Sequence, residues 1–389
     1  MIEATLFSFW LGHEQVLMKI LTISNYYPSH PGGIEFVALN LVKHWRTHHQ
    51  VRWMACDVKN YAYTAETDDV PLPALNFAEE RLGFPYPVPT GKWFSQVMEQ
   101  VKWCDVLHIH DSLYLANIFA FLASRWYHKR LLVTQHVALV PYSHHFKNAL
   151  QKLAYHTLGR FVLEHAEKVV FISERIKNWF ETRMHFRHET AVIRNGVDTA
   201  LFYPATLEER EKARVRLGFS PSEIICLFVG RFTQKKGLHL VHEIARARPQ
   251  YKWLLIGRDE LDPRAWGLDN VTVMSPMAQA ALRQYYIAAD LFLLPSVGEG
   301  FPLAVQEALA CGLPTVVSKE LADDMPDAPL LQMDVSPLAQ VLQILDNLFA
   351  CDHQLLELRH ASAEYAKRWN WENVAHRYEA LLTELVRHH

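Results

Sequence analysis

The chain has 389 residues, half of them hydrophobic, so it can bury the cores of two or three domains. A formal net charge of −3 gives no overall electrostatic case for a nucleic-acid partner. Five scattered cysteines without a Cys-x-x-Cys pair argue against a disulfide framework or a zinc site, and predict reduced core thiols in a cytosolic protein. They are Cys56, Cys104, Cys226, Cys311 and Cys351.

The first segment carries no chemical motif. Residues 1–17 have an acidic residue, Glu3, where a secretory signal needs positive charge, and we expect a disordered or dispensable leader there. The sequence also lacks an apolar run long enough to cross a bilayer. The predicted location is therefore the cytoplasm.

Short β-branched runs alternate with helical patterns, which is the signature of parallel sheets with crossover helices. We expect an α/β protein with two Rossmann-like, doubly wound domains that face a cleft. The first is predicted over 18–197 and the second over 209–368, joined by a linker at 198–208, where GVDTALFYPATLEE is rich in turn residues. Residues 369–389 form a final predicted helix. The expected strands are MKILTIS, QVRWMAC, DVLHIH, LLVTQH, KVVFIS and TAVIR, then ICLFVG, KWLLIG, NVTVM, DLFLLP and LPTVVS.

Three segments of the first domain point to possible contacts. Residues 57–95 are rich in proline and aromatic side chains, and we expect long loops there that form a binding rim. His108 and His110 lie on one face of an expected strand and, with Asp111, could serve as metal ligands. A structural role at the floor of the cleft is the favoured interpretation of these two histidines.

The third segment, residues 143–168, is a predicted basic amphipathic helix. Lys147, Lys152 and Arg160 surround its apolar positions. Such a helix could rest on an anionic membrane, or it could pack on its own sheet as an ordinary surface helix. The pattern alone favours packing on the sheet.

Two cations follow the first strand of the second domain, in ICLFVGRFTQKKGLHLV. Arg231 offers a planar fork for phosphate oxygens and Lys236 a mobile point charge, so the two could neutralise a diphosphate without a metal. The sequence contains no Asp-x-Asp pair that would hold a divalent ion. The alternative interpretation is a solvated basic turn.

Two glutamates, Glu299 and Glu307, stand in SVGEGFPLAVQEALACGLPTVV at the opening of an expected helix. Backbone N–H groups at a helix start attract phosphate, and carboxylates accept sugar or ribose hydroxyls in charge-assisted bonds. A buried loop with a capped helix is the alternative. Together with the nearby cations, the pair favours a binding site for a sugar joined to a nucleotide.

The segments GRFTQKKG, EGFPLAVQEALACGLPTVV, VIRNGVDTALFYP and ISNYYPSHPGGIE resemble the retaining family 4 glycosyltransferases over nearly the whole chain. The resemblance implies the glycosyltransferase B architecture, with a last helix that crosses back onto the first domain. It also implies metal-independent sugar transfer from a nucleotide sugar, with UDP or GDP expected as the nucleotide, to a glycan or lipid-linked acceptor. The implied context is polysaccharide or lipopolysaccharide biosynthesis, in some members with peripheral membrane contact.

The same resemblance implies roles for single residues. Arg231 and Lys236 would hold the donor pyrophosphate, Glu299 would lie at the donor sugar and Glu307 at the ribose. His136, in the segment TQH, would lie beside the donor sugar and is the fourth catalytic candidate. Pro302 departs from a glycine common in this pattern and cannot donate an N–H. Further donor contacts are expected from Gly32, Gly33, Gly257, Arg258, Pro276, Met277, Gly300, Phe301, Pro302, Leu303 and Ala304.

Two other functions remain alternatives for this sequence. A nucleotide-sugar 2-epimerase or hydrolase of the same architecture would need acid and base groups poised on the sugar ring. A catalytically silent nucleotide-sugar-binding partner would be expected to lack Arg231, Lys236 or Glu299, and all three are present.

Overall fold

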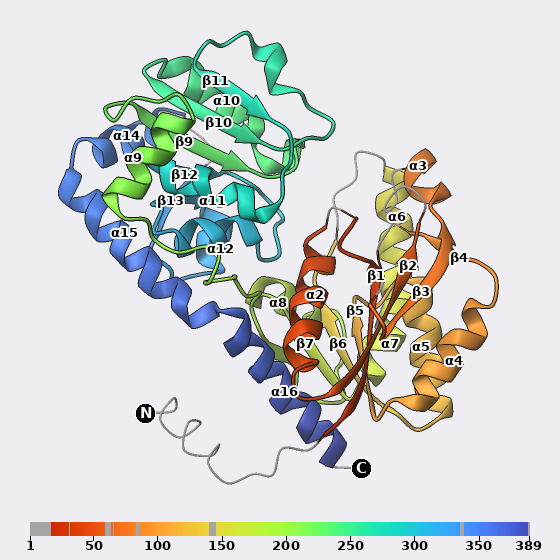
Figure 1. The fold of residues 1–389 in the computed structure, drawn as a ribbon. Helices are drawn as coiled ribbons and strands as arrows, with labels where there is room; N and C mark the ends of the chain where they lie inside the picture. Colours follow the sequence, from red (N-terminus) through yellow and green to blue (C-terminus); the bar gives the residue numbers. More distant parts are fainter. Residues whose placement is uncertain are drawn as a thin grey trace.

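The computed structural model of the protein has two α/β domains, each built on a mainly parallel β-sheet (Figure 1). The structure describes residues 17–30, 32–58, 64, 66–82, 86–139, 145–334 and 338–387. The predicted leader therefore lies outside the described residues, apart from Leu17. Within the described ranges, no helix combines the length and the apolar character that a membrane crossing requires.

The first sheet has eight strands in the order β4-β3-β2-β1-β5-β6-β7-β8, and only the pair β3 and β4 is antiparallel. Its strands are β1 (Lys19–Tyr26), β2 (Gln50–Asp57), β3 (Asp69–Leu75), β4 (Val88–Pro89), β5 (Val106–His110), β6 (Arg130–Gln135), β7 (Lys168–Phe171) and β8 (Ala191–Val192). The central strand β5 is buried along its whole length, as expected of a parallel strand covered on both faces.

Helices from distant parts of the chain cover this sheet. Those within the first domain are α2 (Gly33–Trp45), α3 (Phe77–Leu82), α4 (Trp93–Trp103), α5 (Leu115–Trp126), α6 (His145–Ala154), the π-helical turn Tyr155–Gly159, α7 (Arg160–His165) and α8 (Glu174–Glu181). The last helix of the chain, α16 (Trp371–Arg387), packs beside α2, and Trp45 Nε1 donates a hydrogen bond to the carbonyl of Ala375. The long C-terminal helix thus joins the core of the first domain (Figure 1).

The second sheet has six parallel strands in the order β11-β10-β9-β12-β13-β14. They are β9 (Ile224–Val229), β10 (Tyr251–Ile256), β11 (Val271–Met274), β12 (Leu291–Leu294), β13 (Thr315–Ser318) and β14 (Leu330–Met333). The helices around it are α9 (Leu207–Arg216), α10 (Leu238–Ala247), α11 (Gln279–Ala288), α12 (Leu303–Ala310), α13 (Lys319–Asp323), α14 (Leu338–Phe349) and α15 (Asp352–Ala366), with short 3-10 turns at Gln234–Lys236, Pro263–Trp266 and Lys367–Trp369.

The prediction of an α/β protein with two mainly parallel sheets is confirmed. Two other predictions were wrong, one on residues 57–95 and one on Cys351. Residues 57–95 are not only loops, because they contain β3, α3, β4 and the start of α4. The two prolines of β3 argued against a strand, yet β3 lies next to a neighbour of only two residues, so few of its backbone donors are needed. Cys351 is exposed, whereas the other four cysteines are buried as expected.

The predicted helix over 143–168 is interrupted rather than continuous. It begins at His145, passes through the π-helical turn Tyr155–Gly159, and ends at His165, where Ala166 takes an extended conformation. Residues 143 and 144 and the side chain of Lys147 lie outside what the structure describes.

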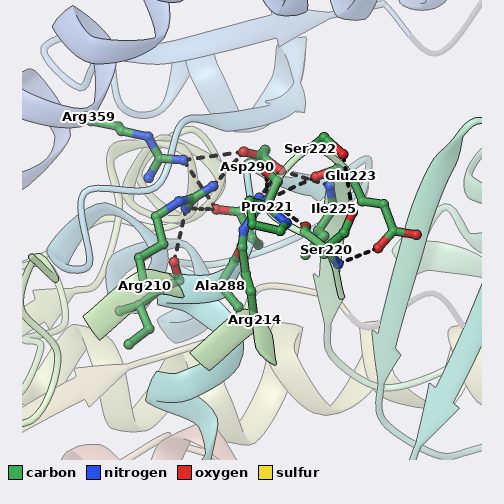
Figure 2. A network of polar contacts seen from close by, with 12 residues as sticks. Arg210, Arg214, Ser220, Pro221, Ser222, Glu223, Ile225, Ala288, Asp290 and Arg359 are labelled. Carbon is green, nitrogen blue, oxygen red and sulfur yellow. Dashed lines mark hydrogen bonds and ion pairs between the residues drawn. The ribbon is translucent and has the colours of Figure 1, made fainter. Parts of the chain in front are cut away.

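An ionic cluster holds the helices of the second domain at the edge of the sheet opposite the carboxyl ends of the strands (Figure 2). Asp290 directly precedes β12 and accepts hydrogen bonds from Arg210 of α9, Arg214 of α9 and the backbone of Ile225. Arg359 of α15 lies 3.9 Å from the same carboxylate. One acidic side chain therefore ties helices α9 and α15 to the two neighbouring central strands β9 and β12.

Candidate functional site

The order of strands reverses once in each sheet, beside β1 in the first and beside β9 in the second. In open α/β sheets ligands bind at such a reversal, outside the carboxyl ends of the strands. The segments after β1, β5, β9 and β12 therefore form the candidate site. They include the predicted residues Gly32, Gly33, Arg231, Lys236 and Glu299.

The centre of the site is an ion pair between Lys236 and Glu299. Lys236 Nζ lies 3.0 Å from Glu299 Oε2, and both side chains are nearly buried, with exposed fractions of 13% and 11%. Burial on its own would raise the pKa of Glu299, but Lys236 and Lys235 outweigh it, so the pKa lies below its usual value. Glu299 Oε1 is buried and has no hydrogen-bond partner among the described residues. The carboxylate is thus ionised and keeps one oxygen available for a ligand.

Arg231 pairs with a different carboxylate, that of Asp259. Its Nε lies 2.5 Å from Asp259 Oδ2, and its side chain is 67% exposed. The structure therefore brings Lys236 to Glu299 but leaves Arg231 at the rim, on an exposed pair that contributes little to stability. An exposed guanidinium of this kind can exchange its carboxylate for the phosphate of a ligand.

Two glycines allow this loop to approach its neighbours closely. Gly237 has a φ of 73°, and a Cβ there would lie 2.4 Å from the carbonyl oxygen of Pro295. A Cβ at Gly257 would lie 1.9 Å from the carbonyl oxygen of Gly230. Gly257 thus has a packing role that accounts for the glycine without any donor contact.

Glu307 lies in a different environment from Glu299. It is buried in α12, where Gln279 Nε2 and the hydroxyl of Tyr286 donate to its two oxygens at 2.8 and 2.7 Å. Burial raises its pKa, and the two hydrogen bonds oppose that rise only in part. Gln279 and Tyr286 were not predicted, although their spacing of seven residues places them on one face of a helix.

The loop of Glu299 also touches the first domain. A Cβ at Gly300 would lie 2.8 Å from the carbonyl oxygen of His136 and 2.9 Å from Ile172 Cδ1. Asn195 donates a hydrogen bond to the carbonyl of Phe301 over 3.1 Å. Phe301 and Pro302 are buried, while Leu303 and Ala304 are half-buried at the start of α12. The structure therefore brings Gly300, the residue after Glu299, against the backbone of His136 across the two domains.

His136 is held by two consecutive residues at the end of β5. Its Nε2 lies 2.9 Å from His110 Nδ1, and its backbone N–H donates to Asp111 Oδ1 over 2.8 Å. Burial lowers the pKa of His136 to about 3 and raises that of Asp111 to about 7. The segment HIHD, considered above as a possible metal site, instead orients a neutral His136. Within the described ranges, no group of three or more metal-ligating side chains occurs.

The glycine pair of the first domain lies beside a buried carboxyl group. Gly32 and Gly33 are exposed ahead of α2, and a Cβ at Gly33 would lie 3.9 Å from Leu303 Cδ1 of the second domain. A Cβ at Gly32 would lie 2.0 Å from Glu35 Oε2, so a larger residue would displace that carboxyl group. Glu35 itself is only 4% exposed.

Replacing Glu35 by glutamine is expected to remove a loss of stability that grows with pH. Burial, with Asp111 and Glu79 adding to it, raises the pKa of Glu35 to about 8 from 4.5. Between these two values the unfolded chain has released a proton that the folded protein retains, so the free energy of unfolding falls as pH rises. In urea unfolding, the advantage of Glu35→Gln over wild type should be larger at pH 8 than at pH 5 by at least about 1 kcal/mol. An equal difference at both pH values would contradict this.

The remaining predicted donor contacts lie farther out. Arg258 and Pro276 are exposed after β10 and β11, and Met277 is half-buried against the core. The structure gives none of these three a contact with Lys236 or Glu299. They stay predictions, resting on their position at the carboxyl edge of the sheet.

Comparisons with known proteins bear on both halves of the chain. Residues 31–201 match the family described as Glycosyltransferase Family 4, and residues 223–340 match Glycosyl transferases group 1. Sucrose-phosphate synthase from Thermosynechococcus elongatus superimposes with a TM-score of 0.75 at 20% identity, covering 95% of this chain and all of that one. The protein has both domains of the glycosyltransferase B fold. HepE from Anabaena, solved in complex with UDP-glucose, shares this fold with a TM-score of 0.73, 17% identity and coverage of 94% of this chain and all of that one.

The curated relatives of this glycosyltransferase B protein are similar over part of their length. A D-inositol 3-phosphate glycosyltransferase of Segniliparus rotundus is 33% identical over 47% of this chain and 44% of its own. The protein of the same description from Mycolicibacterium smegmatis is 29% identical over 52% of this chain and 48% of its own. The chain thus spans less than half the length of these relatives.

Proposed function

We propose that this protein is a retaining glycosyltransferase that moves a sugar from a nucleoside diphosphate to a glycan or glycolipid acceptor. The observation that carries the proposal is the buried pair of Lys236 and Glu299 at the strand reversal of the second sheet. A lysine there can bind phosphate, while the unpartnered oxygen of Glu299 can accept a sugar hydroxyl.

The proposed chemistry is electrostatic. The bond between the anomeric carbon and the phosphate oxygen breaks, the acceptor oxygen bonds to that carbon, and the phosphate takes the acceptor's proton. Lys236, Arg231 and the N–H groups at the start of α12 stabilise the charge that develops on the diphosphate. Because these groups supply positive charge, the scheme requires no metal. Glu299 and His136 hold the sugar between the domains.

The substrate classes follow from the relatives as expectations. HepE was solved with UDP-glucose, so UDP-sugars are the first donors to test, with GDP-sugars next. We propose that the acceptor binds to the first domain. The proposed context of the reaction is the assembly of surface polysaccharide or lipopolysaccharide. The two curated relatives are named as D-inositol 3-phosphate glycosyltransferases. D-inositol 3-phosphate is therefore a further acceptor to test with these donors.

Release of nucleoside diphosphate from a panel of nucleotide sugars, with and without acceptors, tests the proposal. Acceptor-dependent release with retained anomeric configuration is the expected result. Epimerisation of the donor without an acceptor would point to a 2-epimerase. Binding of donors without any turnover would contradict the proposed activity and favour a silent binding partner.

We also propose that α6, the π-helical turn and α7 lie on an anionic membrane. Large apolar side chains project into solvent along this segment, among them Leu153 and Leu158 with exposed fractions of 61% and 50%. Lys152 and Arg160 are exposed beside them. Trp126 of the neighbouring helix α5 is 75% exposed, and Phe121 of α5 packs on Phe161 of α7. Apolar side chains flanked by cations are the features of an interfacial helix.

Replacing Leu153 and Leu158 together by aspartate is expected to lower binding to vesicles that contain phosphatidylglycerol by roughly tenfold or more at low salt. Flotation of the full chain with such vesicles measures the effect. Leu356→Asp is the control, because Leu356 is also largely exposed, at 65%, but lies on α15 of the second domain. Equal flotation of all three proteins, or none by wild type, would contradict the proposed contact.

A further inference from the structure

Arg175 of the first domain makes two contacts with the second domain. Its Nη1 lies 2.8 Å from Glu320 Oε1, and its backbone N–H donates to Asp324 Oδ1 over 3.1 Å. Arg175 lies in the first turn of α8, where the helix dipole favours negative charge. Glu320 lies in α13, and Asp324 follows the last residue of that helix. The start of α8 is therefore docked on acidic residues of the other domain.

Glu320 also holds the loop that carries Glu299. The same atom, Glu320 Oε1, accepts the backbone N–H of Gly298 over 3.0 Å. Gly298 has a φ of 70°, a conformation that few other residues adopt. Glu320 Oε1 thus contacts both Arg175 of the first domain and the N–H of Gly298, which is the residue directly before Glu299.

The same loop packs on the first domain close to this contact. Gly300 lies against the carbonyl of His136 and the side chains of Ile172 and Ile176. Ile172 precedes Ser173, which caps α8, and Ile176 lies in the first turn of α8. The position of Glu299 therefore depends on how the two domains sit against each other.

Arg175 also acts on the site through its charge. Although Lys236 and Lys235 contribute more, Arg175 is among the cations that lower the pKa of Glu299 against the effect of burial. Arg175 and Glu320 are 37% and 38% exposed, respectively. Water can therefore reach the pair, so separating the two side chains costs little free energy.

We infer that Arg175 and Glu320 are positioning residues that fix the Glu299 loop when the two domains close on the donor. The inference rests on the proposed function for its catalytic consequence, but its structural part stands on the contacts alone. Neither side chain needs to touch the substrate, because both act through Gly298 and the orientation of Glu299.

Amide hydrogen exchange of the full chain tests the structural part without any ligand. In Arg175→Ala and in Glu320→Ala, the amides of residues 296–301 should exchange faster than in wild type. Asp323→Ala is the matched control, because Asp323 lies on the same short helix but pairs with Lys319 of its own domain. Unchanged exchange in both test variants would overturn the inference, and so would equal acceleration in the control.

Kinetics with the donor identified by the panel tests the catalytic part. Both alanine variants should lower kcat by roughly three- to tenfold with little change in the KM for the donor, because the contact is partly exposed. Arg175→Lys, which keeps the charge, should recover most of kcat. A raised KM with unchanged kcat would overturn the positioning role. If wild type transfers no sugar at all, the proposed function fails, and the exchange result alone decides whether the contact holds the loop.

Discussion

Replacing Lys236 by methionine is expected to lower kcat/KM for sugar transfer by about a hundredfold or more. Methionine keeps the length of the side chain but removes the charge that would stabilise the leaving diphosphate. The substitution also leaves Glu299 as a nearly buried carboxylate without its nearest cation. Burial is the largest influence on Glu299 and acts to raise its pKa, so the residual activity should require a higher pH than wild type does.

Initial rates over a range of donor concentrations and pH measure this effect. Lys252→Met is the matched control, because Lys252 lies in the same domain but makes only a distant contact of 4.0 Å with Glu223. The control should keep nearly full activity. A Lys236→Met variant with more than half of the wild-type kcat/KM, or with an unchanged pH profile, would contradict the role given to this lysine.

Replacing Asp290 by asparagine is expected to lower the free energy of unfolding by about 3 kcal/mol. Asparagine preserves the shape of the side chain but removes the negative charge that Arg210 and Arg214 share (Figure 2). Arg214 is only 4% exposed, so its charge would be left without a partner in a poorly solvated place. Arg359, whose pKa burial already lowers, would add to the repulsion.

Urea unfolding of the full chain, followed by tryptophan fluorescence, measures this change, because Trp253 is fully buried in the second domain. Asp346→Asn is the control, since Asp346 also pairs with an arginine, Arg248, but is 42% exposed. The control should lose much less stability, as expected of a solvated pair. Equal losses in the two variants would show that burial does not decide the strength of these pairs.

The fold could be predicted because its main signal is local. Runs such as ICLFV and DLFLL are short, apolar and bounded by turn residues, and each became a parallel strand. The segment Asp69–Leu75 was missed because its prolines suggested a loop, while tertiary pairing with β2 made it a strand. Strand β14 was also missed, since it has only four residues and adds the last edge of its sheet.

The site could be predicted only in part, because its geometry is made by segments far apart in the chain. Lys236 and Glu299 could be found, since each lies in the segment that follows a strand at the carboxyl edge of the sheet. Arg175 follows β7 in the same way and was overlooked, because nothing in the sequence pairs it with Glu320. The hold of His110 on His136 depends on the register of β5 and β6, which the sequence does not specify.

The central claim is that the second domain binds the diphosphate of an activated sugar between Lys236 and the start of α12. A crystal structure of the protein with bound UDP, or with GDP if UDP does not bind, tests it most directly. We predict phosphate oxygens within hydrogen-bonding distance of Lys236 Nζ and Arg231, and the terminal phosphate facing Glu299 and His136. A nucleotide bound with its phosphates away from Lys236, or outside the gap between the two sheets, would contradict the account.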